Sequence, residues 1–346
     1  MPQLRILSWN IQDLGTSQVD DASFLDMIAA VVHNYPTDVL CILETKANEG
    51  DRLGKLLKPK INAKTGKTWD HHSSTKSGPR SKKPENYVFL WETSAVTAAG
   101  SWQFPKMPPK IGFIRQHDKE RWPYLGEITF NGKSIWLVAM HSTFTQCEIV
   151  ECNQNLAEIP EVAAGGKKKP NVILMGDFND AGANGRKPKR GMYSFEPLYD
   201  MSTTAAENYL CALDEKTSLK TKETVGALAT LSDARSEEYD HFFWRSTGGE
   251  LTNPVAKTID LVADLLKGQY LHDHGKAVYN GWAKRKNDDE KKPANIKKRK
   301  RAKRPDWVDL PLFGPTDDVT SNAKAFEVYR DGISDHLPIH LTIDVA

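Results

Sequence analysis

Several polar residues of this chain stand at the ends of apolar runs, where folded strands bring distant side chains together. Asp335 and His336 are adjacent, just before the last apolar run of the sequence. The others stand far upstream, at Asn10, Glu44, His141, Asp177 and Asn179. Carboxylates and amides bind hard divalent cations, and imidazoles transfer protons near neutral pH. Together the set indicates metal-assisted cleavage of a phosphoester.

The segment Gly176-Asp177-Phe178-Asn179 follows the apolar run 172–175. Side chains two residues apart on an extended backbone face the same way, so Asp177 and Asn179 reach one ligand together. Gly176 lets a ligand approach the backbone closely. A carboxylate activates water, and an amide donates to a phosphate oxygen without adding negative charge. Taken alone, the segment equally fits an ordinary turn made by Asp and Asn.

Glu44 ends a second apolar run, as Asn10 ends the first. Taken alone, Glu44 fits a solvated strand terminus better than a ligand. Beside Asn10 and Asp335, it predicts an all-oxygen site, which suits Mg²⁺, with Mn²⁺ as the alternative, and not zinc.

Asp240 interrupts an aromatic run, Tyr239-Asp240-His241-Phe242-Phe243-Trp244. A carboxylate that is buried there needs a partner. We expect that partner to be His336, because a carboxylate that orients an imidazole fixes its tautomer and raises its pKa.

Short runs rich in Val, Ile, Phe and Trp predict strands, and long helical patterns are few. We expect strands at about 4–10, 38–44, 86–92, 111–115, 124–130, 134–141, 171–176, 239–245 and 338–344. A helix is predicted over 21–34, capped by Asp20 or Asp21 and stopped by Pro36, with a weaker helix near 147–164. The strand content predicts an α+β fold, a four-layer α/β/β/α sandwich of two mostly antiparallel sheets.

Three segments read as loops or insertions: 51–84, 181–193 and 246–330. The last carries most of the positive charge. Residues 284–304 hold twelve Lys or Arg and three Asp or Glu, a local charge of +9. Because the formal net charge of the whole chain is +2, the remaining residues carry a net charge of −7. We therefore expect one domain over 1–346 with a basic insertion at about 246–330.

The sequence begins without a signal peptide pattern, which predicts a cytoplasmic protein, with nuclear targeting or specialised export as alternatives. Its four cysteines are too few for a disulfide scaffold. The run 63–68 resembles a phosphate-binding loop, but Ile61 stands where that motif requires glycine. Oligomeric state has no signature in the sequence.

The motifs from Asn10 to His336 together resemble the endonuclease/exonuclease/phosphatase superfamily, and within it deoxyribonuclease I and the nuclease subunit of cytolethal distending toxin. The resemblance spans nearly the whole chain and implies a DNase I-like fold. It implies that Glu44 is the main metal ligand, with Asn10 and Asp335 nearby. Asp177 would activate the attacking water, and Asn179 would hold the scissile phosphate.

The resemblance also assigns partners to the two imidazoles. His141 and His336 would be the catalytic histidines, supported by Glu85 and Asp240 respectively. Arg121 would contact a substrate phosphate, and Arg80 would enter the minor groove of DNA. The chain departs from the family pattern at Gln12, where an arginine is usual, and at Lys83, where an aromatic residue is usual.

The basic run Lys297, Lys298, Arg299, Lys300, Arg301 permits three interpretations. It could bind nucleic-acid phosphates, act as a nuclear-import signal, or form a solvated loop. We favour phosphate binding, because the acidic remainder of the chain would otherwise repel DNA.

Our first hypothesis is therefore a Mg²⁺-dependent, sequence-nonspecific DNA endonuclease that cleaves P–O3′ bonds and leaves 5′-phosphates. DNA is favoured over RNA as the partner. The second is a phosphoinositide phosphatase or a sphingomyelinase-like lipid phosphodiesterase with the same centre. The third is a catalytically idle nucleic-acid-binding module, which the complete set of catalytic positions argues against.

Overall fold

The computed structural model describes most of the strand-forming parts of the chain. Its described residues are 1–77, 84–104, 122–142, 170–179, 209–213, 215–219, 235, 239–266, 271, 273–275, 277–278, 280–281, 325–326, 329–330 and 332–346. The first sheet contains β1 (Gln3–Leu14), β2 (Val39–Lys46), β3 (Trp69–Ser73), β4 (Glu85–Glu92), β11 (Leu251–Thr258) and β12 (Ile339–Val345). The second contains β5 (Val96–Gln103), β6 (Tyr124–Phe130), β7 (Lys133–His141), β8 (Asn171–Asp177), β9 (Leu210–Cys211) and β10 (Asp240–Arg245). The helices are α1 (Thr16–Val19), α2 (Ala22–Asn34), α3 (Gly50–Thr65) and α6 (Leu261–Leu266).

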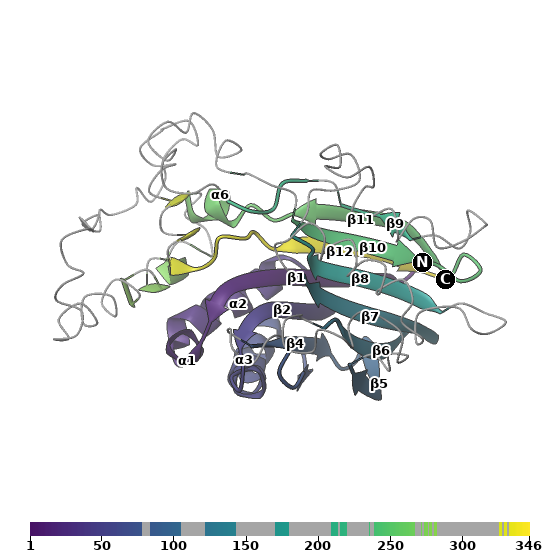
Figure 1. Cartoon of the computed structure of the whole chain (residues 1–346), viewed down its shortest axis with the longest axis horizontal. Coiled ribbons are helices and arrows are strands. Elements are labelled where there is room, and N and C mark those ends of the chain that lie inside the picture. The colour runs from purple at the N-terminus through teal and green to yellow at the C-terminus, as the bar shows by residue number, and fades with distance from the viewer. Residues whose placement is uncertain are drawn as a thin grey trace, which may run out of the picture.

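Both sheets are mixed but mostly antiparallel. The strand order is β11-β12-β1-β2-β4-β3 in the first sheet and β5-β6-β7-β8-β10-β9 in the second. The parallel pairs are β1 with β2 and β7 with β8. Figure 1 shows the two sheets and the helices beside the first of them. The predicted α+β sandwich is therefore confirmed.

The two faces of β1 explain how the layers pack. Leu4 and Ile6 belong to the apolar cluster between the sheets. Leu7 and Trp9 belong to the cluster that joins the first sheet to the helices. Strand side chains alternate between faces, so β1 is buried on both sides. Each of these four side chains has 0% exposure, and a fully buried large apolar side chain contributes roughly 1.5–3 kcal/mol.

Helix α2 forms as the sequence predicts. The Asp21 side chain accepts hydrogen bonds from the backbone N–H groups of Ser23 and Phe24, at 3.0 and 3.3 Å. It thereby satisfies two of the four amide groups that a helix leaves free at its start. The helix ends at Asn34, two residues before Pro36.

The prediction of a loop over 51–84 is wrong for most of its length, because 50–65 form α3 and 69–73 form β3. In α3 the buried apolar side chains are Leu53, Leu57 and Ile61, one stripe at four-residue intervals. Lysines and an internal proline surround that stripe in the sequence, and they hide its helical period. The strand β5 was also not predicted.

The predicted insertion at 246–330 begins too early. Residues 251–258 form β11, which pairs antiparallel with β12 at the edge of the first sheet. Its sequence contains Asn253-Pro254, and proline in a run argues for an edge strand or none.

The Lys/Arg-rich part of that segment lies outside the described residues. So do the strand expected at 111–115, the helix expected near 147–164 and the loop at 181–193. Within the described residues, no helix is both long enough and apolar enough to cross a membrane.

Candidate active site

Polar side chains replace the core side chains at one end of the sandwich. Along β7, Leu137 and Ala139 line the core between the sheets, and two residues later His141 faces the same way. Along β8, Ile173 and Met175 precede Asp177 in the same manner. This alternation places the following residues at one rim between the sheets: Asn10, Glu85, His141, Asp177 and Asp240.

Two backbone features turn the chain at this rim. Gly176 has φ +129, and a Cβ atom there would lie 2.1 Å from the carbonyl oxygen of Met140. Only glycine tolerates that combination, and it brings β8 against β7 just before Asp177. Glu44 has φ +58, and the pairing register of β2 shifts between Ile42 and Thr45. This bulge re-aims the Glu44 carboxylate at the site.

His141 is held by Glu85. Its Nδ1 lies 2.8 Å from Glu85 Oε2, and the ring has 0% exposure. An ionised carboxylate only accepts hydrogen bonds, so Nδ1 donates, and Nε2 is the atom presented to the site. The backbone N–H of His141 also donates to the Tyr87 hydroxyl, at 3.2 Å.

His336 is held in the same way by Asp240. Its Nδ1 donates to Asp240 Oδ2 at 2.7 Å, and both residues are buried. The two partners lie 96 positions apart in the sequence. Both pairs expected from the sequence are thus in contact.

The Asp177 carboxylate lies between the two imidazoles. Its Oδ2 lies 3.6 Å from His141 Nε2 and 3.7 Å from His336 Nε2. The same oxygen accepts a 2.9 Å hydrogen bond from Asn10 Nδ2. Two imidazoles and one amide from three separate strands or turns therefore converge on a single carboxylate oxygen.

Asn179 stands beside Asp177 in a tight turn with φ +52. Its backbone N–H donates to Asp177 Oδ1 at 2.7 Å, and its Nδ2 donates to the carbonyl oxygen of Ser142 at 2.9 Å. These bonds fix the amide plane. The Oδ1 atom is buried and has no hydrogen-bond partner among the described residues.

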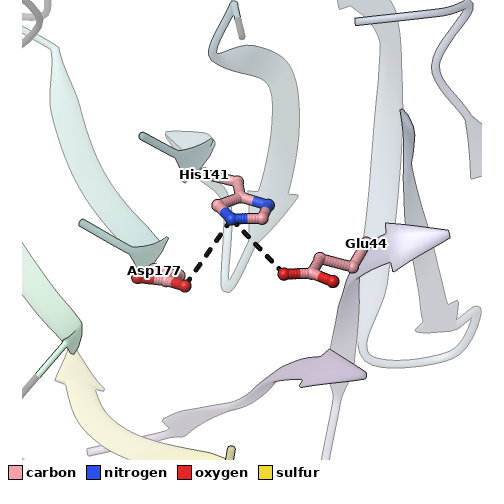
Figure 2. Close-up of side chains that lie close together, drawn as sticks. All are labelled: Glu44, His141 and Asp177. Carbon is pink, nitrogen blue, oxygen red and sulfur yellow. Dashed lines mark ion pairs between the residues drawn. The ribbon is translucent and has the colours of Figure 1, made fainter. Parts of the chain in front are cut away.

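Glu44, His141 and Asp177 each offer one ligand atom, and the three atoms lie within 4.8 Å of one another. Figure 2 shows them pointing toward a common point, with His141 Nε2 3.4 Å from Glu44 Oε1. The Oδ1 of Asn10 is buried and, among the described residues, also lacks a partner. Buried oxygens without a donor beside a carboxylate suit a hard cation and its water ligands, so the residues fit Mg²⁺ or Mn²⁺.

Asp335 lies near this group but not within the 4.8 Å cluster. Its Oδ2 accepts a 2.9 Å hydrogen bond from Gln12 Nε2. Burial raises the pKa of Asp335; the charge of His336 lowers it and the carboxylate of Glu44 raises it. The neutral Gln12 side chain thus contacts a neighbouring acid of the site.

The electrostatics of the site give its acids and imidazoles different protonation. Burial raises the pKa of Asp177 to about 6, with a further increase from Asp240 that His336 and His141 oppose. Burial alone would lower the pKa of His336, but the charges of Asp240 and Asp177 raise it to about 10. Near neutral pH, His336 therefore carries a proton and Asp177 is largely ionised.

Burial would raise the pKa of Glu44, but the charges of His141 and His336 and a hydrogen bond from the backbone of Asp13 lower it overall. The Asp13 N–H lies 3.1 Å from Glu44 Oε2. Glu44 is therefore ionised at neutral pH, as a metal ligand must be.

Some expected residues cannot be placed, and others were missed. Arg80, Arg121 and the run 297–301 lie outside the described residues. Sequence reasoning missed Tyr87, Ser142 and Ser334, which bond the backbone around the site. A serine or tyrosine that bonds a backbone atom leaves no spacing pattern, so no signal in the sequence marks it.

No family model matches the chain. Human deoxyribonuclease gamma is 24% identical over 189 residues, 51% of this chain and 56% of that enzyme, so the match spans little more than half of the relative. Rat deoxyribonuclease gamma is 22% identical over 312 residues, 87% of this chain and 92% of that enzyme. A solved endonuclease/exonuclease/phosphatase family protein from Bacteroides thetaiotaomicron is 12% identical, with a TM-score of 0.52 over 99% of this chain and 95% of that one. The last likeness concerns the fold alone.

Proposed function

We propose that the chain is a metal-dependent phosphodiesterase of the endonuclease/exonuclease/phosphatase superfamily that cleaves DNA internally, because the curated proteins it resembles are deoxyribonucleases. The products would carry 5′-phosphates, after cleavage of P–O3′ bonds. One observation carries the proposal: two imidazole Nε2 atoms, each backed by a carboxylate at Nδ1, lie within 3.7 Å of one buried Asp177 oxygen.

In this proposal Asp177 receives the proton of the attacking water. A pKa of about 6 leaves the carboxylate ionised at neutral pH yet basic enough to take a proton. The Asn179 N–H that donates to Oδ1 holds the carboxylate in one orientation. The other oxygen, Oδ2, then faces the reacting atoms.

His336 and His141 act on the phosphoryl oxygens. His336 is protonated at neutral pH, so it stabilises the negative charge that develops on the pentacoordinate phosphorus and donates to an oxygen there. Glu85 and Asp240 fix the orientation of both rings, which keeps Nε2 toward the substrate. Asn179 holds a non-bridging oxygen of the scissile phosphate without adding charge.

Glu44 would hold Mg²⁺, with Asn10 and Asp335 close by. When bound, the ion supplies charge for the phosphoryl oxygens and the leaving oxygen in the transition state. Asn10 Nδ2 donates to Glu44 Oε1 at 3.2 Å and to Asp177, so it sets the spacing between the two carboxylates.

DNA is the proposed substrate because both curated relatives named above are deoxyribonucleases. The predicted phosphate contacts of Arg80, Arg121 and Lys297, Lys298, Arg299, Lys300 and Arg301 are part of this proposal. Arginine and lysine that neutralise phosphates give affinity without reading sequence, which suits a nonspecific nuclease.

The test is the conversion of supercoiled plasmid to nicked circles by the purified protein, with Mg²⁺, Mn²⁺ or EDTA. We expect divalent-metal-dependent nicking that Asp177→Asn and His336→Gln each reduce by about 100-fold or more. The matched control for the second is His340→Gln, because His340 is also buried but bonds the backbone of Pro36.

A 5′-phosphate at the nick is shown by resealing with DNA ligase. Absence of nicking with either metal, alongside hydrolysis of a phosphoinositide or sphingomyelin substrate, would replace the DNA assignment with the second hypothesis. Equal nicking by His336→Gln and His340→Gln would remove the proposed role of His336.

A further inference from the structure

Ser334 is a buried serine that joins two segments of the site. Ser334 has 1% exposure and lies in the turn before β12. Its hydroxyl donates to the carbonyl oxygen of Asn10 at 2.8 Å. It accepts from the backbone N–H of His336 at 3.1 Å and from that of Gln12 at 3.3 Å. A hydroxyl has one donor and two acceptor positions, and all three are used.

These bonds lie where the sheet no longer holds the two segments together. The register between β1 and β12 begins at Gln3 with Asp344 and ends at Ser8 with Ile339. Asn10 stands beyond that last pair on one strand, and His336 stands beyond it on the other. In place of ladder bonds, the Ser334 hydroxyl connects the ends, aided by the bond from Gln12 to Asp335.

The residues joined in this way meet at the same carboxylate. Asn10 Nδ2 donates to Asp177 Oδ2, and His336 Nε2 faces that oxygen at 3.7 Å. A displacement of the turn relative to β1 would change the distance from His336 Nε2 to the Asp177 oxygen but leave the distance from Asn10 Nδ2 to that oxygen unchanged. Misplacement of about 1 Å in a reacting group costs on the order of 100-fold in rate.

We propose that Ser334 is a positioning residue, which fixes His336 relative to Asn10 across the Asp177 carboxylate. The expected effect on rate rests on the proposed function. The positioning of His336 by Ser334 does not, because it is argued from hydrogen bonds alone. Ser142 makes a comparable connection beside the other imidazole, since its hydroxyl donates to the carbonyl oxygen of Phe178.

The experiment compares Ser334→Ala with Ser246→Ala. Ser246 also accepts a backbone hydrogen bond, from Leu251 at 2.8 Å, but it lies at the far end of β10 from Asp240. With an oligonucleotide substrate and saturating Mg²⁺, we expect Ser334→Ala to lower kcat by about 10- to 100-fold while KM changes by less than about threefold. Ser334→Thr, which restores the hydroxyl, should recover part of kcat. Ser246→Ala should keep both constants.

A second readout does not depend on activity. In metal-free protein, the Nδ1 proton of His336 should give a downfield NMR signal, because it is bonded to Asp240. We expect its exchange with water to become about tenfold faster in Ser334→Ala, while the His141 Nδ1 proton is unchanged. Thermal unfolding shows whether each variant is folded at the assay temperature.

The outcomes separate the two proposals. An inactive wild-type protein would reject the proposed function, and the NMR comparison would still decide the role of Ser334. Wild-type kcat in Ser334→Ala, or lost activity with an unchanged His336 signal, would overturn the positioning role.

Discussion

Asp240 Oδ2 and His336 Nδ1 lie 2.7 Å apart, and this single contact decides which nitrogen of the imidazole faces the reaction. Since the carboxylate accepts from Nδ1, Nε2 is turned to the opposite side of the ring, toward the rim between the sheets. The contact also holds a charged imidazole in a buried place, where burial alone would favour the neutral ring.

The first prediction concerns the pH dependence of that ring. Asp240→Asn removes one of the charges that together raise the pKa of His336 to about 10, so we expect that pKa to fall in metal-free protein, measured by NMR titration. A histidine whose pKa is raised by folding contributes its full stabilisation below the unfolded-state pKa of about 6.5. That contribution is lost as the pH rises through the folded-state pKa. Wild type should therefore lose more stability than Asp240→Asn between neutral and alkaline pH. An identical His336 titration in both proteins would contradict the assignment.

Glu85→Gln tests the partner of the other imidazole. The amide oxygen still accepts from Nδ1 of His141, but the negative charge that favours an imidazolium is lost. We expect kcat to fall by roughly 10- to 100-fold with little change in KM. Glu127→Gln is the control, because Glu127 bonds only a serine on the neighbouring strand among the contacts described. Equal kcat values in the two variants would show that Glu85 has no part in the reaction.

Glu44→Gln tests the metal site. Loss of its charge should weaken Mn²⁺ binding, measured by calorimetry, by about tenfold or more, and EDTA should abolish activity of the wild type. Asp344→Asn removes a partly exposed carboxylate at the opposite end of β12 and should leave the affinity unchanged. If Glu44→Gln binds Mn²⁺ as tightly as wild type, the principal ligand lies elsewhere.

Gly176→Ala tests the close contact between β7 and β8. The added Cβ atom would meet the Met140 carbonyl oxygen at 2.1 Å in a backbone conformation with φ +129. We expect the free energy of unfolding in urea to fall by about 3 kcal/mol or more. Gly66→Ala provides the comparison, since its φ is +70 but nothing lies within 4 Å, and it should cost only about 1 kcal/mol. Similar losses in both variants would mean that the contact with Met140 relaxes easily.

The sequence predicted the elements whose residue pattern has a single interpretation. Strand β6 was placed at its observed bounds, because apolar residues of high strand propensity fill it and Asn131-Gly132 end it. Helix α3 was missed because its three buried side chains are separated by lysines, glycine and proline. Strand β11 was missed because one of its faces is exposed and it contains Pro254.

Only part of the candidate site could be predicted from the sequence. Charged or polar residues that end buried runs, such as Asp177, stand out in a sequence, because burying such a group is costly unless a partner compensates it. The pairing of Glu85 with His141 came from family resemblance, since 56 positions separate them and no spacing rule connects them. The contact of Gln12 with Asp335 could not be foreseen, because it depends on how the end of β1 meets the turn before β12.

The place of β12 has a consequence for the order of events during synthesis. This strand lies between β1 and β11, and Figure 1 shows both chain ends side by side at the end of the sheet where Gln3 pairs with Asp344. Strand β1 therefore keeps one edge unpaired until a segment far along the sequence has been made, since Ser334 and Asn10, which bond beside the pair, are 324 positions apart. Until that segment folds against β1, His336 is not held beside Asp177. The two imidazoles can therefore meet at Asp177 only once β12 has joined the first sheet, so the site forms late in folding.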